Sequence, residues 1–255
     1  LGVRKERIRY RRGSTSVIPD SGTTAATRGT LMGTSAVVRA ADELKRKMSR
    51  VLAAELGCAP ELVRFANDSL WGSDGKQLDW EAAAKLVFAK QDALFAYGSF
   101  AAPPVSWDEA HGQGNAYFTY TYGCQVAEVE VERASGKVRV LSLVAAHDVG
   151  KAFNLPLVEG QVFGGITQAI GYALKEEFVQ TEGRVVSLNF NHYKLPNAGE
   201  LPDFEAIVVQ NPDPNSASRA KGIGEPAIEL GAAAIANAVA AATGRRFTRL
   251  PIRPA

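Results

Sequence analysis

The sequence has few of the side chains that hold metal ions or cross-link small domains. Only two cysteines, Cys58 and Cys124, and three histidines occur among 255 residues. The cysteines lie far apart, without the paired spacing that a structural zinc site or an iron–sulfur cluster requires. His147 and His192 likewise have no second ligand at a useful spacing. We therefore expect core or surface roles for these residues and no metal site built from them.

An excess of charge of one sign and a long apolar run are also missing. The 29 Lys and Arg residues against 27 Asp and Glu leave a net charge of +2, although the first 12 residues are strongly basic. This balance gives little support to nucleic-acid or membrane-surface binding. No apolar run approaches the roughly 20 residues that span a bilayer, and no basic-then-apolar leader stands at the start. We expect a soluble protein in a reducing compartment.

The sequence does have enough apolar residues, 46%, for a sizeable core in one large domain or two small ones. Alternating residues predict strands over 3–11, 117–133, 137–146 and 204–210, and a short hairpin from 177–180 and 184–189. Helical spacing predicts helices over 37–52, 79–97, 157–174 and 228–242, the second capped by Asp79 and the last buried on most sides. Because these elements do not alternate strictly, the pattern favours an α+β fold over a doubly wound parallel sheet. The expected subdomains are 1–115 and 116–255.

Three Gly-rich segments lie at 19–30, 159–171 and 221–228, and each alone is typical of a turn or a tight helix contact. The spacing in the second is not G-x-G-x-x-G, which excludes a Rossmann dinucleotide site. Gly160, Gly164 and Gly171 fall near one face of the predicted helix. Close backbone packing and close approach of a phosphate-bearing cofactor are both open for them.

The third segment places Glu225 between Gly224 and Pro226, at the predicted start of a helix. An acidic residue there complements the helix dipole by about 0.3 to 1 kcal/mol, which is the simplest interpretation. Two glycines just before it cost backbone entropy, however, and are wasteful for that purpose alone. They are better explained if a bulky ligand comes close.

Four segments, in this order, resemble the second half of the molybdenum-binding subunit of xanthine dehydrogenase and aldehyde oxidase family hydroxylases. They are PDSGTTAATRGTLMG at 19–33, DVGKAFNLPLVEGQVFGGITQAIGYALKEE at 148–177, NHYKLPNAGELPDFE at 191–205 and SRAKGIGEPAI at 218–228. The similarity extends over nearly the whole chain, although 57–115 contributes little to it. It implies the carboxyl-terminal portion of a molybdopterin-binding domain, with mixed sheets packed against helices.

The resemblance also implies a catalytic role for Glu225. In that family the Glu of the G-x-G-E-P segment lies beside the molybdenum and takes the proton from its hydroxo ligand. The oxygen then attacks an electron-poor carbon of the substrate while hydride passes to the sulfido ligand. Positioned general bases contribute roughly 10² to 10⁴-fold in rate. The implied reaction is hydroxylation of an aldehyde or an N-heterocycle with oxygen from water.

In the same family, a loop like SGTTAATRGT contacts the pterin through backbone amides and small side chains. Ala25, Ala26 and Thr27 match it, with Arg28 and Thr30 close behind. Small residues suit such a loop because bulk would block the approach of the cofactor. The alternative is a Thr-rich and Ser-rich turn before a helix.

Two further positions complete the implied cofactor site. Gln161 matches a family glutamine that hydrogen-bonds the pterin, since an amide offers both donor and acceptor. An exposed residue in the first turn of a helix is the equally weighted alternative. Gly224 belongs to the implied site beside Glu225, whereas Gln168 is a weaker candidate that we expect to pack. Tyr117, Phe118, Tyr120 and Tyr122 form an aromatic run that is more typical of sheet packing than of base stacking.

The family implies cofactors and partners beyond this chain. Its cofactor is molybdopterin, expected here as the cytosine dinucleotide, and the pterin dithiolene holds the molybdenum without protein ligands. The first half of the family's molybdenum subunit supplies a glutamine, substrate-sandwiching aromatics and an arginine that cannot be located here. We therefore expect three partners: that amino-terminal half, an iron–sulfur subunit with [2Fe–2S] and a flavin subunit with FAD. The cytoplasm is the expected location, or the periplasm if a partner has an export signal.

The chain starts at Leu1 without an initiator Met. A natural split subunit, a processed product and a truncated fragment are all open. A non-catalytic fragment or structural subunit that only closes the cofactor cleft is the alternative function. The intact GIGEP segment favours a catalytic subunit, because a purely structural piece would not require Glu225.

Overall fold

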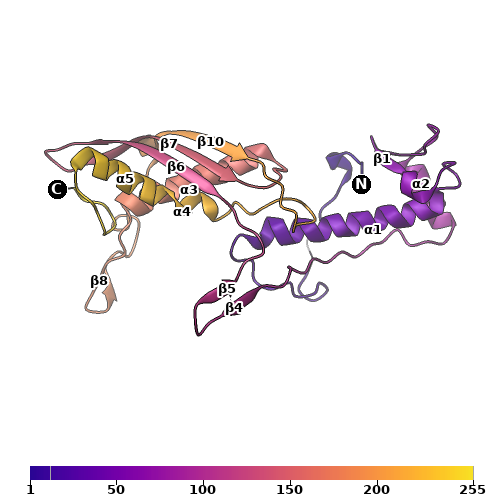
Figure 1. The fold of residues 1–255 in the computed structure, drawn as a ribbon, viewed down its shortest axis with the longest axis horizontal. Helices are drawn as coiled ribbons and strands as arrows, with labels where there is room; N and C mark the ends of the chain where they lie inside the picture. The colour runs from indigo at the N-terminus through magenta and orange to yellow at the C-terminus, as the bar shows by residue number, and fades with distance from the viewer. Residues whose placement is uncertain (12, 255) are drawn as a thin grey trace. The chain divides into compact units, whose positions relative to one another are not determined.

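The computed structural model describes residues 1–11 and 13–254. It divides the chain into two compact units: unit 1 is Leu1–Ala25 with Met32–Ala102, and unit 2 is Ala26–Leu31 with Pro103–Ala255. Each unit combines helices with small sheets (Figure 1). The predicted α+β class is therefore confirmed.

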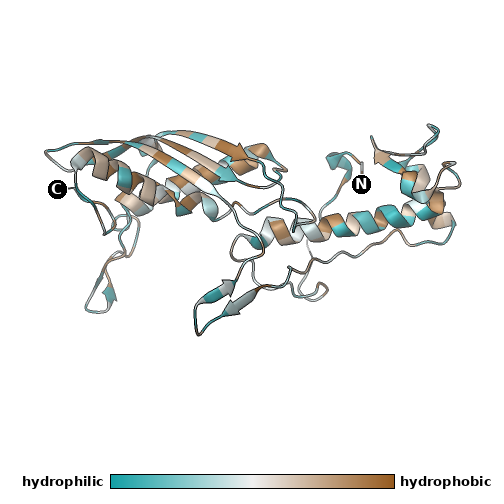
Figure 2. Cartoon of the chain, in the orientation of Figure 1, coloured by the Kyte–Doolittle hydropathy of each residue, from teal (hydrophilic) through white to brown (hydrophobic). Residues whose placement is uncertain are grey.

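Unit 1 is built around the helix α1, which forms where the apolar spacing predicts it. Its main elements are α1 (Thr34–Leu52), an antiparallel sheet in the order β1 (Arg64–Ala66), β2 (Ser69–Trp71), β3 (Gln77–Asp79), and α2 (Trp80–Ala89). Figure 2 shows apolar and hydrophilic positions alternating along α1, whose apolar face buries Met48 and Leu52. These side chains share a core cluster with Leu70 of β2 and Val87 of α2.

The helix predicted over 79–97 begins as expected but ends early. The Asp79 carboxylate accepts a hydrogen bond from the Ala82 amide at 2.8 Å, as an N-cap does. The helix ends at Ala89, and Gln91 adopts a left-handed φ of 59°. The prediction is wrong beyond Ala89.

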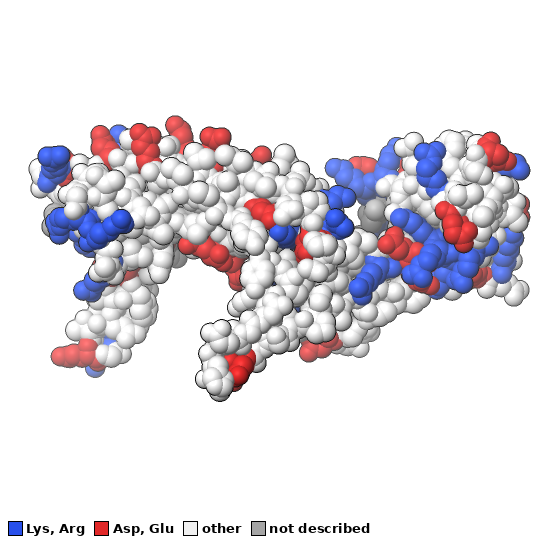
Figure 3. Space-filling view, in the orientation of Figure 1, with Lys and Arg blue, Asp and Glu red and all other residues white. Residues whose placement is uncertain are grey.

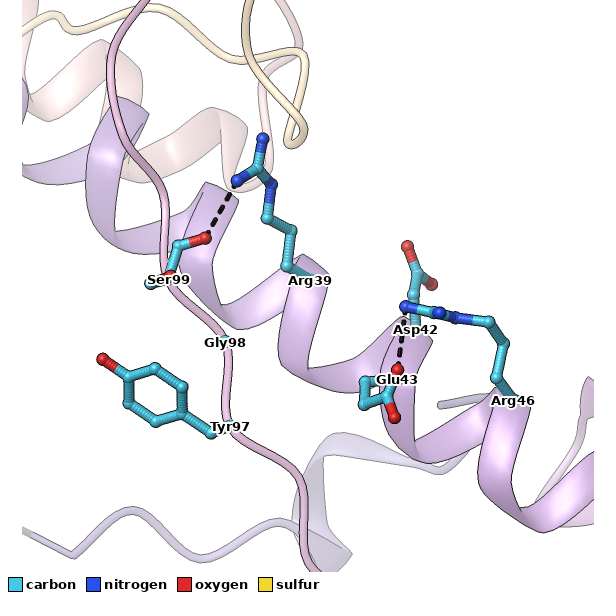
Figure 4. A pocket seen from close by; sticks show the side chains of 7 residues that line it. All are labelled: Arg39, Asp42, Glu43, Arg46, Tyr97, Gly98 and Ser99. Carbon is cyan, nitrogen blue, oxygen red and sulfur yellow. Dashed lines mark hydrogen bonds and ion pairs between the residues drawn. The ribbon is translucent and has the colours of Figure 1, made fainter.

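The segment that follows lies directly against α1 (Figure 4). Arg39 of α1 donates to the carbonyl oxygen of Ser99 at 3.0 Å. A Cβ on Gly98 would lie 2.3 Å from the carbonyl oxygen of Ala36, so only glycine allows this approach. Apolar spacing could not reveal this contact, in which the backbone itself packs on α1.

The strand predicted over 3–11 is wrong. Lys5–Arg7 forms a 3-10 helix, and Tyr10 is 87% exposed. Arg4 forms an ion pair with Asp68 of the same unit. The alternation of apolar and charged residues here has no sheet to bury its apolar side, which explains the failure.

Unit 2 contains the main sheet, in the order β10 (Asp203–Val209), β7 (Val138–Asp148), β6 (Gly123–Val131). β6 and β7 form the predicted antiparallel hairpin, and β10 pairs parallel to β7. The parallel pair is joined through α3 (Leu155–Leu174), as parallel strands require a crossover. Two small hairpins are β4 (Ser106–Asp108) with β5 (Gln113–Asn115), and β8 (Gln180–Thr181) with β9 (Arg184–Val185).

The aromatic run before β6 does not lie in the sheet. β6 starts only at Gly123, and Tyr117, Tyr120 and Tyr122 are exposed. Tyr117 and Tyr120 instead stack edge to face, with ring centroids 6.1 Å apart. The prediction that these rings pack in a sheet is wrong.

Three helices cover one face of the main sheet (Figure 1): α3, α4 (Pro226–Glu229) and α5 (Gly231–Thr243). The core between them includes Leu143, Ala145, Val162, Ile166, Ile235 and Val239. α5 was predicted to be buried on most sides, which is wrong. It buries one stripe of Gly231, Ile235 and Val239, because it lies on the sheet surface with its other side open.

Within the described residues, Pro226–Thr243 is one stretch with the length and hydropathy of a membrane span. The core helix of a soluble protein can have the same length and hydropathy. The stretch is divided at Leu230 into α4 and α5, and it packs against α3 and β6.

The opposite face of the sheet is open and carries carboxylates. Glu128 and Glu130 on β6 and Glu205 on β10 are exposed there, together with Val126. Figure 3 shows acidic side chains along one edge of unit 2 and many Lys and Arg side chains over unit 1. The near-neutral chain therefore combines two units of different surface charge.

Leu143→Ala tests the unit 2 core. Leu143 is fully buried on β7, so the variant should lose about 2–5 kcal/mol in the free energy of unfolding. Urea denaturation measures this loss. Leu188→Ala is the matched control, because Leu188 is 75% exposed and its truncation leaves no cavity. Equal destabilisation by both variants would contradict this core.

Candidate functional site

The site is built on a buried ion pair at the end of β7. Asp148 is the last residue of that strand, and its carboxylate pairs with the ammonium of Lys221. The two side chains are only 6% and 7% exposed. Asp148 also accepts a hydrogen bond from the Gly150 amide at 2.9 Å, and the ring centroid of Tyr122 lies 5.8 Å from the Lys221 nitrogen. A buried charge is tolerated only when it is paired in this way.

Backbone hydrogen bonds hold the Lys221 segment against the same sheet edge. The Lys221 amide donates to Val149 O, and the Lys151 amide donates to Arg219 O, both at 2.9 Å. Gly150 has a φ of 64°, and a Cβ on it would lie 2.6 Å from Arg219 O. Glycine is therefore required where the two segments meet.

The glycine loop 222–224 packs on Thr27, far away in the sequence. A Cβ on Gly222 would lie 2.4 Å from both the Thr27 carbonyl oxygen and its methyl carbon. The Gly224 amide donates to the Thr27 hydroxyl at 2.7 Å. At Gly222, then, the close neighbour that requires glycine is this chain's own Thr27.

Thr27 is itself held in an uncommon conformation. Ala26 and Thr27 have φ values of 51° and 52°, in the left-handed region that disfavours residues with a Cβ. Such conformations cost of order 1–3 kcal/mol each and persist where the surroundings impose them. The packing of Thr27 against Gly222 and Gly224 is such a constraint. Strained positions of this kind cluster at active sites and ligand clamps.

Helix α3 brings Gln161 to the same loop. Asn154 is the N-cap of the helix, and its side chain accepts from the Leu157 amide at 3.2 Å. Gln161 is exposed, and its side-chain oxygen lies 3.9 Å from the place of a Cβ on Gly224. Gly160 and Gly164 have no atom within 4 Å of their Cβ positions, so the strip beside Gln161 is open.

The structure distinguishes the other residues of α3. A Cβ on Gly171 would lie 3.0 Å from Pro196, so this glycine serves close packing, unlike Gly160 and Gly164. Gln168 is exposed, and the prediction that it packs is wrong. It lies two turns from Gln161, on the helix face that the core leaves uncovered.

Glu225 follows the loop directly and is exposed, whereas Pro226 and Ala227 after it are buried. In the part of the chain that the structure describes, the Glu225 side chain makes no capping hydrogen bond to α4. The Ala227 carbonyl oxygen accepts from the side-chain amide of Gln125 at 2.8 Å. An exposed carboxylate thus lies between two anchored points, Lys221 before it and Ala227 after it.

Of the residues predicted for the site, Thr27, Gln161 and Gly224 lie together in unit 2, and Glu225 directly follows Gly224 in the chain. Ala26 precedes Thr27 in the same unit and is exposed, and Arg28 is half-buried. Thr30 lies in the π-helical turn Gly29–Gly33, and Ala25 belongs to unit 1.

Sequence reasoning missed Asp148, Lys221 and Gln125, whereas His147 is buried, in keeping with the core or surface role expected for it. The first two lie inside the DVGK and KGIGEP segments, so they could have been found as a pair of opposite charges at the ends of matched motifs. Gln125 and His147 have no local signal, because only the pairing of β6 with β7 brings them together.

The chain matches one family model and is similar to known dehydrogenase subunits. The model of the molybdopterin cofactor-binding domain family matches residues 1–202. The chain is 29% identical to the 6-hydroxypseudooxynicotine dehydrogenase complex subunit gamma of Paenarthrobacter nicotinovorans, over 100% of this chain and 32% of that protein. It is also 29% identical to a probable xanthine dehydrogenase subunit of Bacillus subtilis, over 99% of this chain and 33% of that protein.

A solved structure adds the fold. The aldehyde oxidoreductase from Desulfovibrio gigas matches 93% of this chain and 23% of its own, with a TM-score of 0.74 and 26% identity. This chain spans about a third of the length of the curated relatives described above.

Lys221→Met tests the buried pair. The variant leaves the Asp148 carboxylate buried without its cation, so we expect a loss of about 3–5 kcal/mol in the free energy of unfolding. Chemical denaturation measures it. Asp148→Asn combined with Lys221→Met removes both charges and should recover much of the loss. Lys85→Met, in the exposed pair with Glu81, is the control and should change little. A fully stable Lys221→Met variant would show that the pair is unimportant.

Proposed function

Because the chain belongs to the molybdopterin cofactor-binding domain family, we propose that it forms one wall of the active site of a molybdenum hydroxylase, with Glu225 as general base. The reaction class is that of the xanthine dehydrogenases and aldehyde oxidoreductases. The proposed substrate is an aldehyde or an N-heterocycle, oxidised with oxygen from water. One observation carries the proposal: Thr27, Gln161 and Gly224 converge beside Glu225 from three separate segments.

The residues at this point suit a pterin. Gln161 offers an amide donor and acceptor, and Gly160 and Gly164 leave an open strip beside it for a flat group. We assign Ala25, Ala26, Thr27 and Arg28 to the loop that faces the cofactor, together with Gln161 and Gly224. When bound, the cofactor supplies the oxidising molybdenum centre, which its dithiolene holds without protein ligands. We propose the cytosine dinucleotide form.

Glu225 suits the role of a base for three reasons. It is exposed, its own side chain makes no capping bond within the described structure, and the backbone on both sides is anchored. A carboxylate in such a place is free to accept a proton from the water-derived oxygen as that oxygen attacks the substrate carbon. The anchored backbone supplies the pre-organisation that general-base catalysis requires.

The proposal also includes partners. The chain covers about a third of its curated relatives, one of which is named as subunit gamma of a dehydrogenase complex. We propose that the substrate-binding residues lie on the remaining two thirds of such a molybdenum subunit. An iron–sulfur subunit with [2Fe–2S] and a flavin subunit with FAD would then remove the electrons. The cytoplasm is the proposed location.

Glu225→Gln tests the proposed base in the assembled enzyme. Turnover should fall at least 100-fold with molybdenum content unchanged, because an amide cannot accept the proton. Steady-state kinetics and metal analysis measure both quantities. Glu205→Gln, on the open face of β10, is the matched control and should keep normal turnover. Normal turnover of Glu225→Gln would favour the alternative, a subunit that only closes the cofactor cleft.

Expression of this chain alone tests the proposed division of the site. The isolated chain should bind little molybdenum and lack turnover, because the substrate-binding groups are elsewhere. It should also associate through exposed apolar surface, since obligate interfaces commonly bury over about 2,000 Å². Size-exclusion chromatography and metal analysis measure these properties. A stable monomer that holds stoichiometric molybdopterin and oxidises an aldehyde or heterocycle would contradict the proposal.

A further inference from the structure

Gln125 lies on β6, and its side chain reaches α4. Its side-chain nitrogen Nε2 is 2.8 Å from the carbonyl oxygen of Ala227 and 3.0 Å from Nε2 of His147. Ala227 is two residues after Glu225 and fully buried. Gln125 therefore links β6 and β7 to the short helix that directly follows the proposed base.

The hydrogen-bond chemistry fixes which way this amide points. A carbonyl oxygen only accepts, so the Gln125 atom beside Ala227 O must be the nitrogen. The same nitrogen faces Nε2 of His147, which must then be the acceptor. His147 is consequently neutral, with its proton on Nδ1. The amide uses one N–H for each partner.

The other end of the amide does not contribute to this orientation. The Gln125 oxygen Oε1 is buried and has no hydrogen-bond partner among residues 1–11 and 13–254. An unsatisfied buried carbonyl is unfavourable, so the amide does not point this way for the sake of its oxygen. The two bonds from Nε2 hold the orientation, and one of them depends on the protonation state of His147.

We propose that Gln125 is a positioning residue for Glu225, and that a protonated His147 prevents it from holding Ala227. The inference rests on the proposed role of Glu225 as base. α4 has only four residues and packs on α3, and the bond from Gln125 to Ala227 O ties this short helix to β6. If Nε2 of His147 carried a proton, two N–H donors would face each other and the hydrogen bond between Gln125 and His147 would be lost. Gln125 would then turn away from Ala227 and release the backbone that follows Glu225.

The surroundings of His147 decide when this happens. Burial lowers the pKa of His147, and the carboxylate of Glu229 on α4 partly offsets this by raising it. Asp148, next on β7, is paired with Lys221, and the residues opposite His147 on β6 and β10 are Gly123 and Val208. His147 therefore stays neutral at neutral pH and takes a proton only in acid.

The sign of the pH effect follows from this lowered pKa. The folded state holds a proton on His147 less readily than the unfolded state does. The anchor and its stabilisation are therefore fully present above the ordinary histidine pKa of about 6.5. They are lost progressively as the pH falls below that value.

Amide hydrogen exchange of the full chain tests the inference without any cofactor. In the wild type, protection of amides 227–230, measured relative to unstructured rates, should fall at least tenfold between pH 8 and acid. Gln125→Met has a similar shape and no donor, so these amides should exchange at least tenfold faster already at pH 8. Gln168→Met, on the exposed face of α3, is the control and should behave as the wild type does. Unchanged protection in Gln125→Met would overturn the proposal.

A second variant separates the switch from the anchor. His147→Met leaves Gln125 free to bond Ala227 O, so protection should persist into acid. If His147→Met keeps the wild-type pH dependence, the role of His147 is wrong. Were Gln125→Met not to fold, the wild type still decides: the His147 ring signals in NMR and the protection of 227–230 must share one titration midpoint. Separate midpoints would overturn the proposal.

Kinetics of the assembled enzyme distinguish this inference from the proposed function. Gln125→Met should lower kcat about tenfold with KM unchanged and remove the His147-dependent acid limb of the kcat profile. If Glu225→Gln stays fully active, the proposed function fails, whatever the exchange data show. If Glu225→Gln is inactive while Gln125→Met keeps wild-type kcat and acid limb, the inference fails and the proposed function stands.

Discussion

The buried ion pair between Asp148 and Lys221 is the constraint on which the rest of the site depends. It joins the end of β7 to a segment more than seventy residues later, at a place where neither charge can reach water. Two buried charges are stable there only while both remain, because each desolvated group needs the other. The glycine loop 222–224 therefore starts from Lys221, whose position at the end of β7 is fixed.

Because Lys221 is fixed in place, the residues that follow it need a glycine and meet a strained Thr27. The loop leaves Lys221 and meets Thr27 at once, and there is room only because Gly222 has no side chain. Thr27 has a left-handed backbone conformation there, and its hydroxyl accepts a hydrogen bond from the Gly224 amide. Of the two glycines before Glu225, Gly222 makes room for Thr27 of the chain itself. Gly160 and Gly164 on α3 instead leave open surface beside Gln161.

The sequence predicted well whatever depends on strong local periodicity. α1, α3 and β7 form within a few residues of their expected ranges, because one face of each is buried. β6 begins only at Gly123 rather than at 117. The failures share a physical cause, which is that alternation or apolarity does not reveal whether a partner surface exists. The strand over 3–11 has no sheet beside it, and α5 meets the sheet along one stripe only.

The site shows the same division. Glu225, Thr27 and Gln161 could be predicted because they lie in recognisable segments, whereas Gln125 becomes significant only after β6 pairs with β7. A base must be open to its substrate, so its side chain cannot be fixed by burial. The position of the proposed base must therefore be fixed by the backbone on either side of it. Here Lys221 before Glu225 and Ala227 after it are both buried and are held to the same sheet. The upstream anchor is the buried ion pair between Asp148 and Lys221. The downstream anchor holds only while His147 is neutral, so protonation of this histidine loosens the backbone that follows the carboxylate.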